Sequence, residues 1–127
     1  MISILLVSHS KKIAEGLKEM IEGMTSNQEF VTVIALGGSA NGGFGTDLDS
    51  IHQTLIERIT HDEAILIFTD LGSSSMIAEQ AVDKLDKKLR KQVHLIDAPL
   101  VEGAFITASQ LVDEDSLEDV LDELDDL

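Results

Sequence analysis

Residues 2–10 read ISILLVSHS, and this stretch decides the fold that we expect for the chain. Ile2–Val7 is apolar except for Ser3, which is typical of a short strand buried on both faces of a sheet. The sequence turns polar at Ser8-His9-Ser10, where such a strand would end. We therefore expect a buried first strand that leads directly into a loop carrying a histidine.

The same alternation of strand and helix patterns continues along the chain. Three further apolar runs have strand character: Phe30–Leu36, Ala64–Thr69 and Val93–Ile96. The segments around them repeat apolar residues at helical spacing: Ile13, Leu17, Met20, Ile21 and Met24; Leu48, Ile51, Leu55 and Ile59; Ile77, Ala81 and Leu85; residues 101–111; and Leu117, Val120, Leu121 and Leu124. Helix caps are expected at Thr46 or Asp47 and at Ser116.

Buried strands that alternate with helices predict an α/β fold. We expect a doubly wound, mainly parallel four-stranded sheet with helices on both faces. No linker, repeat or low-complexity segment divides the 127 residues. The length suits one core, so we expect a single domain over residues 1–127.

Composition and charge exclude several classes of function. The chain has no cysteine, which rules out disulfides and thiolate chemistry. A formal net charge of −15 argues against non-specific nucleic-acid binding. No apolar run approaches the roughly 20 residues of a membrane span, and no basic leader precedes the first strand, so a cytoplasmic protein is expected.

The charges are unevenly placed. Residues 113–127 hold nine acidic residues and no basic one, whereas five of the nine Lys and Arg residues fall within residues 84–91. We interpret both clusters as solvated helix surface, with protein docking as the alternative.

Only one of the four histidines falls where ligands bind in a fold of this kind. The loops after parallel strands emerge at one edge of the sheet, and here they are residues 8–10, 37–47, 70–75 and 97–99. His9 lies in the first of these loops. His61 and His94 come before or at the start of strands, and His52 lies inside a helix, so they are expected elsewhere.

The other loops at this edge are suited to holding an anion. Glycines at 37–38 and 42–43 let backbone N–H groups approach closely, and helix amino termini carry partial positive charge. Hydroxyl donors are also available: Ser10, Thr46, Ser73 and Ser74. Asp70 and Asp97 add carboxylates, and Asp70 is expected nearer to His9 because the third strand of such sheets usually lies beside the first.

This combination is typical of phosphoryl transfer through histidine. A neutral imidazole is a competent nucleophile near neutral pH. A carboxylate on one ring nitrogen holds the proton there and leaves the other nitrogen free to attack. Each feature has an ordinary structural interpretation as well, since glycines make turns, and serines and Asp70 can cap helices. Their convergence on His9 favours the functional interpretation.

The sequence also resembles a known family over nearly its whole length. Residues 4–10 (ILLVSHS) with 14–16 (AEG) resemble the mannose-type enzyme IIA family of the sugar phosphotransferase system. The more specific resemblance, to the phosphotransferase subunits of phosphoenolpyruvate-dependent dihydroxyacetone kinases, is carried by residues 35–38 (ALGG), 44–47 (FGTD), 69–73 (TDLGS) and 98–104 (APLVEGA). The last of these segments is the most distinctive.

The resemblance implies roles for individual residues. His9 would be phosphorylated on Nε2, with Asp70 on Nδ1. The candidates for holding the phosphoryl group are Ser10, Gly38, Thr46, Gly72 and Ser73. No metal or cofactor is expected. The implied phosphoryl donor is the phosphocarrier protein HPr, and the acceptor is ADP on the nucleotide-binding subunit of dihydroxyacetone kinase. The resemblance also implies a homodimer.

Three alternatives remain open at this stage. A mannose-type sugar-transport component would use the same histidine with a membrane-associated acceptor. A response-regulator receiver would be phosphorylated at Asp70, but it needs an acidic pair where Ser8-His9 stands. A non-enzymatic anion- or nucleotide-binding module is the third, although neither GxxxxGK[ST] nor GxGxxG follows the first strand.

Overall fold

A computed structural model describes residues 1–26, 29–62 and 64–127 of the chain. Its strands are β1 (Ile2–Ser8), β2 (Val31–Gly37), β3 (Ala64–Thr69) and β4 (Val93–Leu95). Its α-helices are α1 (Lys11–Met24), α2 (Leu48–Ile59), α3 (Gly72–Asp83), α4 (Lys87–Arg90), α5 (Leu100–Gln110) and α6 (Leu117–Leu124), and a 3-10 turn covers Glu114–Ser116. The predicted alternation of strands and helices is confirmed.

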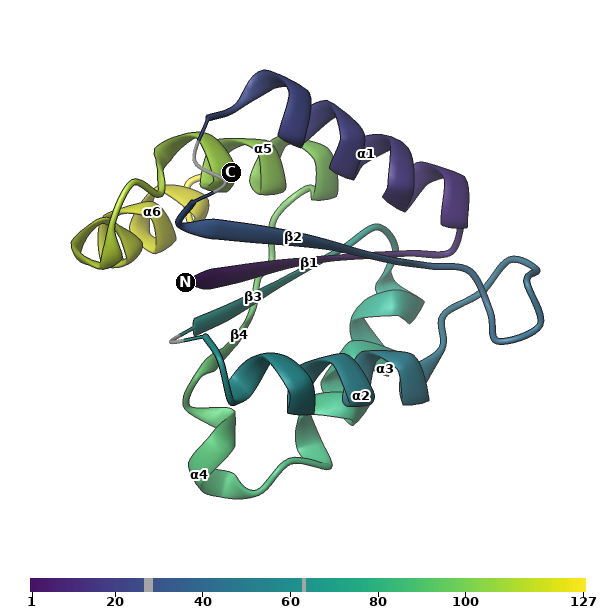
Figure 1. The fold of residues 1–127 in the computed structure, drawn as a ribbon. Coiled ribbons are helices and arrows are strands. Elements are labelled where there is room, and N and C mark those ends of the chain that lie inside the picture. The colour runs from purple at the N-terminus through teal and green to yellow at the C-terminus, as the bar shows by residue number, and fades with distance from the viewer. Residues whose placement is uncertain (27–28, 63) are drawn as a thin grey trace.

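The four strands form one parallel sheet in the order β2-β1-β3-β4. β1 is therefore central, with Ser8 beside Gly37 of β2 and Val7 beside Thr69 of β3. Since all strands run in the same direction, the loops after β1, β2 and β3 meet at one edge, and so do the starts of α1, α2 and α3 (Figure 1). The predicted fold class is confirmed, including the contact of the third strand with the first.

Helices cover both faces of the sheet. α1, α5 and α6 lie on one face and α2, α3 and α4 on the other (Figure 1). Side chains along β1 alternate between the two: Ile4 and Leu6 pack with Leu17 and Ile21 of α1, whereas Leu5 joins the residues of α2 and α3. β1 is buried along its whole length, which explains why its sequence is apolar without alternation.

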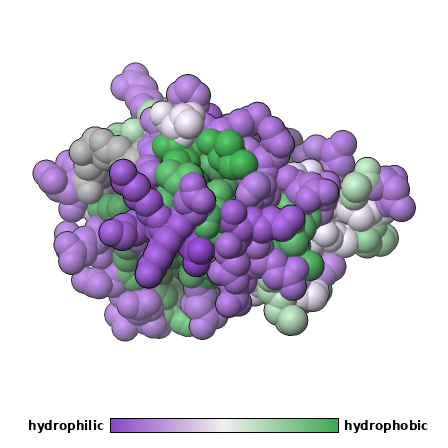
Figure 2. Space-filling view, turned by 90° about the horizontal axis from the view of Figure 1, so that it is seen from below, coloured by the Kyte–Doolittle hydropathy of each residue, from purple (hydrophilic) through white to green (hydrophobic). Residues whose placement is uncertain are grey.

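The outer surfaces of the helices are mainly polar. Figure 2 shows the face that carries α2, α3 and α4, where hydrophilic residues cover most of the surface and hydrophobic ones gather in a few patches. α4 holds much of the basic cluster, including Lys87 and Arg90, and no residue of it is fully buried. This short helix was not predicted separately, since one turn shows no apolar period.

Two local predictions differ from the structure. Ser74, Ala78 and Ala81 form the buried face of α3, while Ile77, expected to face inward, is only partly buried. Through these small residues α3 packs against α2 and the sheet. Ser116 stands before α6 as expected, but its hydroxyl donates to Asp113 O instead of capping the helix.

A buried polar cluster lies at the amino edge of the sheet, which is opposite to His9. The Asp62 carboxylate accepts hydrogen bonds from Ser3 Oγ and from Arg58 Nε and Nη2, the latter two at 3.0 and 2.8 Å. Asp62 is only 3% exposed. Because Ser3 is the one polar residue in Ile2–Val7, this cluster explains the interruption in the first apolar run.

Candidate functional site

The loop that carries His9 is short and held at several points. β1 ends at Ser8 and α1 begins at Lys11, so the loop consists of His9 and Ser10. Ser10 is the N-cap of α1 and accepts a hydrogen bond from Ile13 N (3.3 Å). The carbonyl of His9 accepts from Gly45 N (3.0 Å). The backbone at His9 is thus tied both to α1 and to the glycine-rich loop between β2 and α2.

Gly37 allows the close approach of β2 to this loop. A Cβ at Gly37 would overlap the backbone of Ser10 and would lie 2.7 Å from Lys11 Cα. Gly38 follows with φ of 85°, a left-handed conformation that glycine adopts without strain, and its N–H donates to Ser8 O (3.1 Å). Packing against the histidine loop therefore requires glycine at 37, and the left-handed backbone favours glycine at 38.

Asp70 receives hydrogen bonds on both carboxylate oxygens. Oδ2 accepts from the backbone N–H of His9 and from Ser8 Oγ, both at 2.9 Å. Oδ1 accepts from Leu71 N (2.7 Å) and Ser74 Oγ (2.9 Å), and it lies 3.1 Å from His9 Nδ1. The position follows from the fold, because Asp70 comes directly after β3 and its own N–H donates to Val7 O.

These bonds keep Asp70 ionised. Burial by itself would raise the pKa of the carboxyl group, but the hydrogen bonds from the His9 backbone and ring, Ser74 and Ser8 outweigh burial and lower the pKa to about 2. At neutral pH the group is therefore a carboxylate that can only accept hydrogen bonds.

The two nitrogens of the His9 ring have different environments. Nδ1 faces inward, 3.1 Å from Asp70 Oδ1 and 3.0 Å from Ser74 Oγ. Nε2 faces outward, 2.8 Å from the exposed hydroxyl of Ser73. The side chain is 28% exposed. A proton on Nδ1 directed at the carboxylate leaves the Nε2 lone pair toward the open side, which is the arrangement that a nucleophile requires.

The start of α3 lies on the open side of the ring. Gly72 and Ser73 are its first two residues, and the first N–H groups of a helix have no partner within the helix. A Cβ at Gly72 would meet nothing within 4 Å. The helix amino terminus and the Ser73 hydroxyl together provide neutral donors for an anion near Nε2.

The other predicted binding residues have different hydrogen-bond partners. The Ser10 hydroxyl caps α1, and the Gly38 N–H is bound to Ser8 O. The hydroxyl of Thr46 lies 2.9 Å from Ser74 Oγ, on the inner side of the site. These three residues are close to His9 in the fold, but the groups named here are already engaged within the chain.

Sequence reasoning missed the Ser8 hydroxyl and did not distinguish Ser74 from the other serines. Ser8 is fully buried and donates to Asp70, and Ser74 is fully buried between Asp70 and the ring. A polar residue at the end of an apolar strand was the only signal for Ser8. The signal for Ser74 was its spacing, because it is four residues beyond Asp70.

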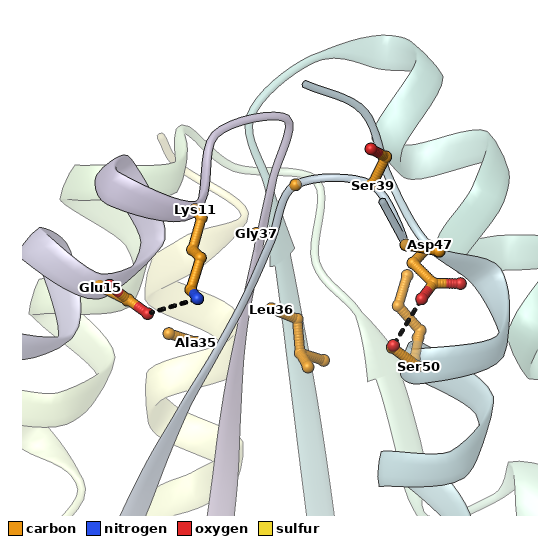
Figure 3. A pocket seen from close by; sticks show the side chains of 11 residues that line it. Lys11, Glu15, Ala35, Leu36, Gly37, Ser39, Asp47 and Ser50 are labelled. Atoms are coloured by element: carbon orange, nitrogen blue, oxygen red, sulfur yellow. Dashed lines mark hydrogen bonds and ion pairs between the residues drawn. The ribbon is translucent and has the colours of Figure 1, made fainter. Parts of the chain in front are cut away.

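The second carboxylate of this edge does not contact the ring. Asp97 lines a surface pocket together with Asp70 and Gly72, on the β4 side of the site. A further pocket lies between α1, β2 and α2 (Figure 3), where Lys11 pairs with Glu15 at 4.0 Å and Ser50 donates to Asp47. His9 is not among the residues that line either of these two pockets.

The remaining histidines lie away from the site, as predicted. His52 is inside α2, His61 follows α2, and His94 is in β4, where burial lowers its pKa. In the described ranges 1–26, 29–62 and 64–127, no three His, Asp or Glu side chains could together hold a metal ion. Among the same residues, no helix is long and apolar enough to cross a membrane.

Fold and site together define a class: an α/β protein whose parallel sheet presents a histidine paired with an aspartate at its carboxyl edge. Within this class the chain belongs to the EIIA-man family, whose model, described as PTS system fructose IIA component, matches residues 3–122.

Curated relatives support this membership. The chain is 47% identical over 124 residues to the PEP-dependent dihydroxyacetone kinase 2, phosphoryl donor subunit DhaM of Listeria innocua, and the match covers 98% of this chain and 97% of the relative. It is 36% identical to the PEP-dependent dihydroxyacetone kinase, phosphoryl donor subunit DhaM of Providencia stuartii. That match covers 97% of this chain but 26% of the relative, so the chain spans about a quarter of that protein.

Two solved structures have the same fold. A crystal structure of a protein of unknown function matches with a TM-score of 0.85 and 44% identity, covering 97% of this chain and 92% of the other. The phosphotransferase system component EIIA from Streptococcus agalactiae matches with a TM-score of 0.67 at 19% identity, covering 99% and 91%. The second likeness concerns the fold alone.

Proposed function

We propose that this chain is a phosphoryl carrier and that Nε2 of His9 is the atom that bears the phosphoryl group. One observation carries the proposal: Nδ1 faces the ionised Asp70 at 3.1 Å while Nε2 lies on the open side beside Ser73. In this arrangement the nucleophilic nitrogen is accessible to a second protein and the proton is kept away from it.

The transfer needs no cofactor. The Nε2 lone pair forms a bond to phosphorus as the bond between phosphorus and the donor's leaving nitrogen breaks. The proton stays on Nδ1, so the ring becomes positively charged, and the Asp70 carboxylate stabilises that charge. In the second step an oxygen of the acceptor attacks phosphorus, the Nε2–phosphorus bond breaks, and the ring returns to its neutral form.

We propose the immediate partners from the family resemblance, and the names of the relatives support the dihydroxyacetone kinase among them. The donor is the phosphocarrier protein HPr, which carries its phosphoryl group on a histidine nitrogen. The acceptor is ADP held on the nucleotide-binding subunit of a phosphoenolpyruvate-dependent dihydroxyacetone kinase. We also propose that residues 1–127 act as one carrier domain, in a cytoplasmic homodimer. The 47% identity to a phosphoryl donor subunit over almost its whole length supports the assignment to a dihydroxyacetone kinase.

Phosphorylation of the purified chain tests the proposal. Incubation with phosphoenolpyruvate, enzyme I and HPr should add one acid-labile phosphoryl group, seen by intact mass. His9→Ala should abolish the gain, and His61→Ala, which changes a histidine outside the site, should retain it. Uptake by His9→Ala would place the chemistry on another residue.

Discharge of the phosphorylated chain then distinguishes the acceptors. The ADP-loaded subunit of a dihydroxyacetone kinase should remove the phosphoryl group and form ATP. The family description, PTS system fructose IIA component, makes a sugar-transport component the second candidate. Discharge only by membrane sugar-transport components would favour that candidate and reject the kinase.

A further inference from the structure

Ser74 is a buried hydroxyl at the centre of the site. Its side chain is fully buried in the first turn of α3. Its oxygen lies 2.9 Å from Asp70 Oδ1, 3.0 Å from His9 Nδ1 and 2.9 Å from Thr46 Oγ1. A serine hydroxyl has one proton and two lone pairs, so three neighbours can all be satisfied in only a few ways.

The direction of each hydrogen bond follows from the carboxylate. Asp70 is ionised and can only accept, so the Ser74 proton points to Oδ1. Both lone pairs of Ser74 are then available as acceptors. One receives the proton of Thr46 Oγ1, and the other receives the proton on His9 Nδ1. Every polar group in the set then has a partner.

The opposite assignment leaves a conflict. If Ser74 donated to Nδ1, the ring proton would be on Nε2 and the Nδ1 lone pair would face Asp70 Oδ1 across 3.1 Å. Two acceptors at that distance repel each other. Asp70 would also lose the Ser74 proton. The hydrogen-bond set therefore favours one tautomer of the neutral ring, with the proton on Nδ1.

Asp70 alone would define the tautomer less well. Its Oδ1 already receives Leu71 N at 2.7 Å, besides Ser74 and the ring. Ser74 Oγ offers the Nδ1 proton a second acceptor at a slightly shorter distance than Oδ1, 3.0 against 3.1 Å. Because Ser74 is fully buried, water cannot readily replace it.

We propose that Ser74 is a positioning residue that holds the proton of neutral His9 on Nδ1, and that Thr46 orients Ser74 by donating a hydrogen bond to it. The glycine-rich loop thereby acts on the reactive nitrogen through two hydroxyls, without touching it. The inference rests on the proposed function, in which Nε2 must be unprotonated to accept the phosphoryl group.

The tautomer can be measured without any phosphoryl transfer. Long-range proton–nitrogen correlation spectra of the ¹⁵N-histidine-labelled chain, in mildly alkaline solution where histidine rings are neutral, report the two tautomers. His9→Gln assigns the His9 signals. We expect the Nδ1–H form to dominate in the unchanged chain. Ser74→Ala should raise the proportion of the Nε2–H form about three- to tenfold, the range expected for loss of one hydrogen bond.

Thr46→Val provides a second, milder variant that keeps the side-chain shape. It should move the tautomer ratio in the same direction by a smaller factor, and Thr46→Ser, which retains the hydroxyl, should restore it. Ser75→Ala is the matched control: Ser75 is the next residue of α3, but its hydroxyl contacts Thr69 Oγ1 at 2.5 Å. It should leave the His9 tautomers unchanged.

The outcomes separate this inference from the proposed function. Unchanged His9 tautomers in Ser74→Ala would overturn the inference, and Thr46→Val decides in the same way if Ser74→Ala does not fold. A wild-type chain that takes up no phosphoryl group would overturn the proposed function, while the tautomer measurement would still stand. If both hold, the rate of phosphoryl uptake should fall in the order wild type, Thr46→Val, Ser74→Ala.

Discussion

The two ends of the central sheet each hold a carboxylate bonded to a serine from β1, but the surroundings differ. At the amino edge Asp62 accepts from Ser3 and from the permanently charged Arg58, and the group is almost fully buried. At the carboxyl edge Asp70 accepts from Ser8 and faces the ring of His9, whose outer nitrogen is open. The same pair of residue types thus serves different purposes.

The difference lies in the side chain that joins the serine and the carboxylate, which is Arg58 at the amino edge and His9 at the carboxyl edge. A guanidinium cannot give up its proton in a protein, so Arg58 keeps its charge and links Ser3 of β1 to α2. An imidazole can be neutral or charged near neutral pH. In the mechanism that we propose, the carboxylate beside it stabilises the positive charge that the ring gains on phosphorylation.

Removal of the carboxylate at the carboxyl edge tests the functional half of this comparison. Asp70→Ala should slow phosphoryl uptake by a factor on the order of 10²–10⁴, because the ring loses the partner that orients it and stabilises its charge. Intact-mass spectrometry of samples quenched at set times, with HPr as donor, measures the rate. Uptake at the unchanged rate, in a variant with wild-type circular dichroism, would reduce Asp70 to a structural role.

Removal of the cation at the amino edge tests the structural half. Arg58→Met keeps the length of the side chain but leaves the buried Asp62 carboxylate without its charged partner. The free energy of unfolding should fall by about 3 kcal/mol, as measured by urea denaturation. The rate of phosphoryl uptake by the folded protein should stay the same. A slower rate with unchanged stability would show that the two ends are not independent.

The contact between β2 and the histidine loop can be changed by one methyl group. Gly37→Ala should lower the unfolding free energy by about 1–3 kcal/mol through overpacking, and it should also slow phosphoryl uptake, since the loop of His9 must move. Gly16→Ala, at an exposed position in α1 with nothing within 4 Å, is the matched control. It should stabilise the chain by about 1 kcal/mol. A Gly37→Ala variant with wild-type kinetics would show that the loop tolerates the shift.

Acid should reduce the stabilisation that the carboxyl-edge cluster gives to the fold, over the pH interval between the two pKa values of Asp70. The pKa of Asp70 is lowered in the folded chain to about 2 from its ordinary value of 3.8. Ionised Asp70 therefore stabilises the fold above pH 3.8, and this contribution is lost as the pH falls towards 2. The difference in unfolding free energy between the wild type and Asp70→Asn should shrink over that interval. A difference that stays constant would contradict the lowered pKa.

Much of this architecture could be predicted because it follows from local patterns. The apolar runs predicted the bounds of the strands to within a residue or two, and those predicted for β3 are the ones that the structure has. The proximity of His9 and Asp70 followed from one topological rule, since both come directly after strands that are neighbours in the sheet. The position of α4 and the buried face of α3 did not follow, because one-turn helices and close packing leave no clear apolar period.

The sequence by itself determined which residues reach the carboxyl edge, because strand order and chain direction bring whole loops there whatever their side chains do. Only the tertiary structure decided what each group at that edge contacts. Ser10, Gly38 and Thr46 were predicted to face the phosphoryl group, and the structure engages the Ser10 hydroxyl, the Gly38 N–H and the Thr46 hydroxyl within the chain. The direction of a hydroxyl depends on how α3 is rotated against the sheet and on where the β2–α2 loop crosses it. The rotation of α3 and the path of the loop are set by many packing contacts between residues that are distant in the sequence, and no spacing along the chain encodes them.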